Sequence, residues 1–117
     1  MSTHISKEIS LCLFRVAQEA LHNAVKYSGV NQFTVGLIGK EDEIQLIEND
    51  AGVGFDVEKT TVNRGLGLLS MQERIHLVRG SFSVNSKPGQ GTTILAAVPF
   101  VPENRRTQHR MQPQIIA

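Results

Sequence analysis

The chain has 117 residues and a formal net charge of +1, and 40% of its residues are hydrophobic. This length predicts one globular domain, and the near-neutral charge argues against direct binding of nucleic acid through a broad basic surface. No apolar run approaches the roughly 18 residues of a membrane-spanning helix. The N-terminus lacks a secretory signal pattern, and Cys12 has no second cysteine for a disulfide. We therefore expect a cytoplasmic chain, whether or not a parent protein is anchored in a membrane.

Residues 5–27 carry a helical pattern. At about 100° per residue, the apolar side chains of this segment fall on one broad arc. They are Leu13, Val16, Ala17, Ala20, Leu21 and Ala24. Ser6 is placed to cap the start of this helix, and Ser28-Gly29 is typical of a helix end.

The rest of the chain predicts two hairpins separated by a second helix. A polar stretch after the first hairpin leads into this helix, over residues 66–80, with Gly80 as its C-cap. The strands are expected at residues 32–39, 44–49, 81–87 and 92–100. This order predicts an α+β two-layer sandwich, with a mixed, mostly antiparallel sheet and the helices on one face. We expect residues 1–101 to form the domain and residues 102–117, which lack periodicity, to be disordered.

A polar stripe runs along the first predicted helix. Glu19, Asn23 and Lys26 are spaced i, i+4, i+7 and share one helix face, opposite the apolar arc. A solvated face is one reading. The other is a site for a magnesium-bound phosphate chain, because an amide oxygen is a hard ligand for Mg²⁺ and an ammonium neutralises phosphate charge. Which of these two interpretations applies depends on the glycine motifs elsewhere in the chain.

Two glycine pairs lie about ten residues apart, Gly52 with Gly54 and Gly65 with Gly67. Neither pair has the third glycine and the strand-to-helix context of a dinucleotide fingerprint, and the chain contains no P-loop. The remaining possibility is that both pairs belong to one ligand site. Asp50 at the end of a strand can accept a hydrogen bond from an exocyclic amine, and the second pair, expected at a helix N-terminus, favours phosphate. The residues between the pairs would then form a flap over the ligand.

Four segments occur in an order that resembles a known family. "EALHNAVKYS", "NDAGVGFD", "GLGLLSMQERI" and "GQGTTI" resemble the N box and the three glycine boxes of the histidine kinase ATP-binding domain. That domain has the Bergerat fold, which it shares with gyrase, Hsp90 and mismatch-repair ATPases. The resemblance covers about residues 8–100 and is greatest to kinases of the nitrate-sensor-like subfamily.

The resemblance implies roles for the polar stripe and for the end of the second strand. Asn23 would coordinate a Mg²⁺ that bridges the phosphates of ATP, and Glu19 would be the acidic residue that assists catalysis. Lys26 would contact phosphate. Asp50 would bind the adenine amine N6, beside Asn49, which stands where many relatives have an acidic residue.

The resemblance also implies roles for the glycines and for the last strand. Gly52 and Gly54 would shape the adenine end of the pocket. The segment Gly65, Leu66 and Gly67 would close over the phosphates. Thr92 and Thr93 would lie at the adenine, with Thr93 reaching it through its side chain or a water molecule.

The phosphate-accepting histidine of these kinases is not recognisable in this chain. None of the four histidines has the expected acidic neighbour; they are His4, His22, His76 and His109. The resemblance therefore implies transfer to a histidine on a separate dimerisation domain, with a response regulator that carries a helix-turn-helix domain as the downstream partner. Two alternatives stay open. They are an anti-sigma-factor-type serine kinase, against which "MQERI" argues, and a nucleotide-binding interaction module without catalysis.

Overall fold

A single antiparallel sheet forms one layer of the molecule, with its strands in the spatial order β1-β2-β4-β3. The computed structural model describes residues 5–59 and 62–100. The strands are β1 (Thr34–Gly39), β2 (Glu43–Asp50), β3 (Ser81–Ser86) and β4 (Thr92–Pro99). The helices are α1 (Lys7–Tyr27), α2 (Val62–Leu77) and a short 3-10 turn, η1 (Val57–Lys59).

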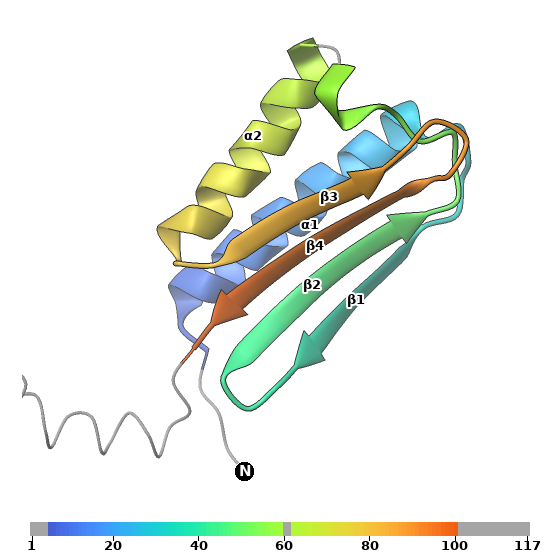
Figure 1. Ribbon diagram of the computed structural model, residues 1–117. Helices are drawn as coiled ribbons and strands as arrows, with labels where there is room; N and C mark the ends of the chain where they lie inside the picture. The colour runs from blue at the N-terminus through green and yellow to red at the C-terminus, as the bar shows by residue number, and fades with distance from the viewer. Residues whose placement is uncertain (1–4, 60–61, 101–117) are drawn as a thin grey trace, which may run out of the picture.

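Helices α1 and α2 lie side by side on the same face of the sheet (Figure 1). This arrangement confirms the predicted two-layer α+β sandwich. Each strand pair in the described part of the chain is antiparallel, so none of the parallel pairing expected of a mixed sheet occurs there. The long β2–β4 pairing sets Asp50 opposite Thr92, at the end of the sheet where the site described below is found.

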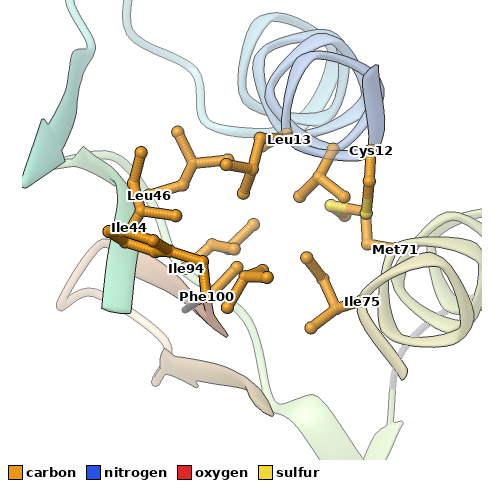
Figure 2. Packing of buried hydrophobic residues seen from close by; sticks show 12 residues of the cluster. Cys12, Leu13, Ile44, Leu46, Met71, Ile75, Ile94 and Phe100 are labelled. Carbon is orange, nitrogen blue, oxygen red and sulfur yellow. The ribbon is translucent and has the colours of Figure 1, made fainter. Parts of the chain in front are cut away.

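The core fills the space between the sheet and the two helices (Figure 2). Apolar side chains alternate along β2 and β4 and point toward the helices, as a sheet with one covered face requires. The buried core residues include Leu13, Val16, Ala20, Ile44, Leu46, Met71, Ile75, Ile94, Ala96, Val98 and Phe100. The apolar arc predicted on the first helix thus contributes directly to this core.

The ends of α1 follow the predicted capping chemistry. The Oγ atom of Ser6 accepts a hydrogen bond from the backbone N–H of Ile9 at 3.2 Å, which satisfies one of the free amides of the first turn. At the other end, the N–H of Ser28 donates to the carbonyl of Ala24, and Gly29 follows with a φ of 79°. Both boundaries are confirmed.

The start of α2 differs from the prediction. The helix begins at Val62, four residues before the predicted start, so Gly65 and Gly67 lie inside it. Because a glycine within a helix costs only about 1 kcal/mol relative to alanine, a helix that continues into apolar sequence can run through two of them. The prediction that the second glycine pair presents free amides at a helix N-terminus is therefore wrong for this structure.

The end of α2 also differs from the prediction. The residue in the left-handed region is Arg79, with a φ of 63°, and not Gly80. The N–H of Arg79 donates to His76 and that of Gly80 to Ile75, which is the pair of bonds of a Schellman motif. Gly80 is needed for space, since a Cβ there would lie 2.5 Å from the carbonyl oxygen of Ala97.

Several predictions concern residues outside the described ranges. The predicted tail at 102–117, and with it His109, lies there, as do His4 and two residues of the expected flap. Among the described residues, neither helix is long and apolar enough to cross a membrane.

Candidate functional site

A cavity opens between the second half of α1, the inner face of β2 and β4, and the loop after β2. The side chains that line it come from regions far apart in the sequence. They include Asn23, Tyr27, Glu48, Asp50, Leu68 and Thr92. The cavity therefore brings together the N-box helix, the end of the second strand and the start of the last strand, as the motif order predicted.

Asp50 sits at one end of this cavity and is 6% exposed. Its Oδ1 atom accepts a hydrogen bond from the N–H of Gly52 at 2.9 Å. This bond holds the loop after β2 in a tight turn and uses only one of the two carboxylate oxygens. A buried acidic side chain at the end of a strand is thus fixed in orientation by its own loop.

Backbone contacts hold the loop after β2 against its neighbours. The N–H of Val53 donates to the carbonyl of Ser28 at 2.8 Å, and the N–H of Gly89 donates to the carbonyl of Val53 at 2.6 Å. A Cβ on Gly52 would collide with the Ser28 carbonyl. Gly54 has a φ of 64° and lies against the Lys87 carbonyl. Both glycines are therefore required at this end of the cavity, where the sequence predicted them.

The last hairpin adds a hydroxyl pair to the same end. The Ser86 and Thr92 oxygens are 2.8 Å apart, and Ser86 Oγ also accepts from the N–H of Phe55 and lies 2.9 Å from the Gly91 carbonyl. Thr92 lines the cavity, as predicted. Ser86 was not predicted, although its place opposite Thr92 in a hairpin puts both side chains on the same face.

Thr93 does not reach this cavity. Its Oγ1 atom donates to Oδ1 of Asn49 at 3.1 Å, on the face of the sheet that carries no helices. Successive side chains of a strand point to opposite faces, so Thr92 and Thr93 cannot both face the cavity. The side chain of Thr93 therefore faces away from the cavity in this structure, and its expected contact with adenine stays a prediction.

The polar stripe of α1 is divided by the packing of α2. Gly67 lies against it, and a Cβ at Gly67 would be 2.9 Å from Oε2 of Glu19 and 3.1 Å from Nδ2 of Asn23. Lys26 instead is exposed, with its ammonium 5.4 Å above the ring of Tyr27. Glu19, Asn23 and Gly67 are thus brought together, whereas Lys26 is not among the residues that line the cavity.

The two other members of the second glycine segment lie elsewhere. Gly65 lines a separate depression with Phe82 and Val84, because two residues along a helix rotate the side chain by about 200°. Leu66 is 59% exposed. Of the three residues expected over the phosphates, only Gly67 faces the polar stripe in this structure.

Two buried side-chain polar atoms have no hydrogen-bond partner in the described part of the chain, Nδ2 of Asn23 and Oε2 of Glu48. Both residues line the cavity. Burial, followed by the nearby charge of Asp50, raises the pKa of Glu48 to about 7. Unpaired buried polar atoms are rare because they lose their hydration without compensation, so these two atoms point to a ligand.

The enclosed volume of the cavity is about 20 Å³, room for about one water molecule. Pockets for drug-sized ligands measure roughly 300 Å³ or more, so a larger ligand needs the walls to separate. No cluster of three His, Cys, Asp or Glu side chains suited to a metal occurs in the described part of the chain. A cation here would take part of its coordination from a ligand.

Comparison with known proteins assigns this arrangement to a family. Residues 8–102 match the family described as histidine kinase-, DNA gyrase B-, and HSP90-like ATPase. The chain belongs to this family. The match spans all four predicted boxes, which confirms the resemblance drawn from them.

Two curated relatives narrow the comparison within this ATPase family. The signal transduction histidine-protein kinase/phosphatase DegS of Bacillus subtilis is 39% identical over 98 residues, 82% of this chain and 26% of the relative. The oxygen sensor histidine kinase NreB of Staphylococcus carnosus is 40% identical over 93 residues, 80% of this chain and 27% of the relative. The chain is thus similar to histidine kinases of the nitrate-sensor-like type, and it spans about a quarter of their length.

A solved structure agrees on the fold. The histidine kinase domain from the Erythrobacter litoralis EL346 blue-light activated histidine kinase matches with a TM-score of 0.60 at 14% identity. The match covers 80% of this chain and 45% of that one. At this identity the likeness shows the fold alone, and it agrees with the antiparallel sheet and paired helices described above.

Proposed function

We propose that this chain is the ATP-binding catalytic domain of a sensor histidine kinase, which transfers the γ-phosphate of Mg-ATP to a histidine on a separate dimerisation domain. The observation that carries the proposal is the meeting of Asn23, Asp50 and Thr92 in one cavity, in a chain of the ATPase family. A response regulator with a helix-turn-helix domain would be the next partner, and the reaction would take place in the cytoplasm.

The adenine would lie at the end of the cavity defined by the loop after β2. Asp50 would accept from the adenine amine N6 through the oxygen that does not bind Gly52. Gly52 and Gly54 keep side chains out of this end, and Thr92 would offer its hydroxyl. These groups would orient the nucleotide without touching the phosphates.

The triphosphate would lie along the polar stripe of α1. Mg²⁺ commonly uses one or two protein ligands together with phosphate oxygens, and Asn23 and Glu19, which lie close together beside Gly67, fit that pattern. The ion would neutralise phosphate charge. Glu19 would assist the transfer as an acid or base, and Lys26 would contact phosphate after turning away from Tyr27.

Gly67 occupies the space next to these two side chains, so the first turns of α2 would move before a triphosphate enters. Gly65, Leu66 and Gly67 would then cover the phosphates. Because the enclosed volume is small, a nucleotide would need such an opening to enter.

Binding of a non-hydrolysable ATP analogue with Mg²⁺, followed by calorimetry, tests this proposal. We expect the wild type to bind and Asp50→Ala to lose at least tenfold in affinity, because a hydrogen bond to a charged group contributes about 1.5–3 kcal/mol. Asp42→Ala, at an exposed turn, is the matched control and should bind like wild type. Equal binding by wild type and Asp50→Ala would refute the adenine assignment.

The chemical step is tested with γ-labelled Mg-ATP and a supplied dimerisation domain. We expect an acid-labile label on histidine, and its loss in Asn23→Ala. An acid-stable label would instead indicate the serine kinase alternative, and binding with no transfer to a cognate dimerisation domain would indicate an interaction module.

A further inference from the structure

Glu48 is an acidic side chain in a place where the sheet otherwise buries apolar ones. It follows Ile44 and Leu46 on the inner face of β2 and is 1% exposed. Its Oε2 atom has no hydrogen-bond partner among the described residues. It lines the same cavity as Asp50, two residues later on the same face of the strand. A buried carboxyl oxygen that lacks a partner and lies beside this cavity indicates a position where a ligand atom binds.

The surroundings of Glu48 favour its neutral form. The cavity is lined from α1 by Ala20, Asn23, Ala24 and Tyr27, from α2 by Leu68, from β4 by Thr92 and Ile94, and from the loop by Gly54 and Phe55. The titratable groups among these are Asp50 and Tyr27, and no lysine, arginine or histidine lines the described cavity. Burial and the Asp50 charge together raise the pKa of Glu48 to about 7. A neutral carboxyl has one O–H to donate and one carbonyl oxygen that accepts.

We propose that Glu48 is a base-selecting residue of this site, whose protonated carboxyl donates a hydrogen bond, directly or through one water molecule, to an acceptor nitrogen of the purine ring. The inference rests on the proposed ATP-binding function and adds a second polar contact to the base. The enclosed space beside Glu48 is about 20 Å³, so the purine would reach this carboxyl after the walls separate, as for the rest of the nucleotide.

The paired carboxyl groups match adenine by their opposite roles. Adenine carries an amine donor beside a ring nitrogen that accepts, so an accepting Asp50 and a donating Glu48 complement it. Guanine carries the reverse pattern, an oxygen acceptor beside a ring N–H donor. Ionised Glu48 would set a carboxylate against the ring-nitrogen lone pair of adenine. Guanine would set its oxygen acceptor against the accepting Asp50 in either state, so the proton on Glu48 decides how well adenine binds.

Binding of adenine should therefore take up a proton when Glu48 starts ionised. Below about pH 7 the residue is already protonated and affinity should be constant. Above it, affinity should fall by a factor that approaches tenfold per pH unit, which is the linkage expected for one proton. Between pH 6 and pH 8 the wild type should weaken about tenfold more than a variant that cannot ionise at position 48.

The test is calorimetric binding of a non-hydrolysable ATP analogue with Mg²⁺ to the full chain at pH 6, 7 and 8. Wild type is compared with Glu48→Gln, whose amide donates at every pH. Because both proteins bind the same ligand, any titration of the ligand itself cancels in the comparison. Glu43→Gln is the matched control. It removes a carboxyl from the same strand, on the other face, where Glu43 Oε2 accepts from Gln45 Nε2. We expect the affinity of wild type to fall with rising pH relative to that of Glu48→Gln. The affinity of Glu43→Gln should follow that of wild type.

The outcomes separate the two proposals. Equal pH profiles for wild type and Glu48→Gln, with binding intact, would overturn the role of Glu48 and leave the ATP site standing. Absence of binding by wild type at every pH would overturn both.

A second measurement needs no variant and no turnover. In wild type, the ¹³C resonance of the Glu48 carboxyl is followed through a pH titration with and without the analogue. We expect the nucleotide to shift the midpoint to higher pH. A shift to lower pH would show that the ligand binds the carboxylate and would overturn the inference.

Discussion

On the inner face of β2, the Glu48 carboxyl keeps its proton up to about pH 7 because it is buried beside Asp50. The ordinary pKa is 4.5, so between these values the folded protein holds a proton that the unfolded chain has lost. Stability from this group is therefore fully present below about pH 4.5 and declines as pH rises to about 7. The total loss corresponds to about 3 kcal/mol.

Glu48→Gln should remove this loss, because the amide does not ionise. We expect the free energy of unfolding of the variant to exceed that of wild type by about 1–3 kcal/mol between pH 5 and pH 8. Urea unfolding across that range, in the absence of nucleotide, measures the difference. Glu43→Gln should follow the wild-type profile, and a Glu48→Gln profile parallel to wild type would contradict the argument.

Glu48 also shows where sequence reasoning at the residue scale stops. The alternation Ile44, Leu46, Glu48 indicated that the third side chain faces inward, and this signal could have singled it out. Its burial, however, depends on α1 lying over the sheet, which no local pattern states. Thr93 is the opposite case. The alternation of the last strand was sufficient to separate it from Thr92, and the motif resemblance obscured it.

At the scale of elements, α1 was predictable because periodicity and both caps agree. The start of α2 was not, since two glycines suggested a boundary that the helix runs through. Its end was predicted within the last turn, but the left-handed position falls on Arg79 and not on Gly80. Which of two adjacent residues takes a positive φ depends on the approach of Gly80 to β4, a tertiary contact.

This arrangement predicts opposite effects of two substitutions at neighbouring positions. Arg79→Gly should stabilise the chain by up to about 1 kcal/mol, because it removes the strain of a left-handed side chain, offset in part by a freer unfolded state. Gly80→Ala should destabilise it, since the added Cβ meets the Ala97 carbonyl and the Ile75 side chain. Thermal unfolding of both variants measures these changes in stability. A change of the same sign in both variants would contradict the prediction.

Across the whole molecule, one core joins the helix layer to the sheet. Ile75 is fully buried between them. Ile75→Ala should lower the free energy of unfolding by about 2–5 kcal/mol, with the transition still cooperative. Leu77→Ala, two residues later on the same helix and 82% exposed, should change it by less than about 0.5 kcal/mol. Denaturant unfolding followed by circular dichroism checks both, and similar losses would refute this account of the core.

The helices do not cover the sheet evenly. They lie over β2, β4 and β3, and the edge strand β1 keeps Val35 and Leu37 41% and 61% exposed, although both face the helix side. Sequence alone predicted the two layers and that both helices share one face of the sheet. It did not predict this offset, because the pattern of β1 resembles that of a covered strand.

The loop after β2 is held by the backbone of Val53, which bonds to both Ser28 and Gly89, whereas the Val53 side chain is 57% exposed. The loop should therefore tolerate many residues at position 53 but no change in its length. Deleting one residue between Asp50 and Gly54 would pull the amide away from Ser28 and the carbonyl away from Gly89 together. A screen of random changes in this segment should thus recover substitutions at 53 freely and insertions or deletions almost never.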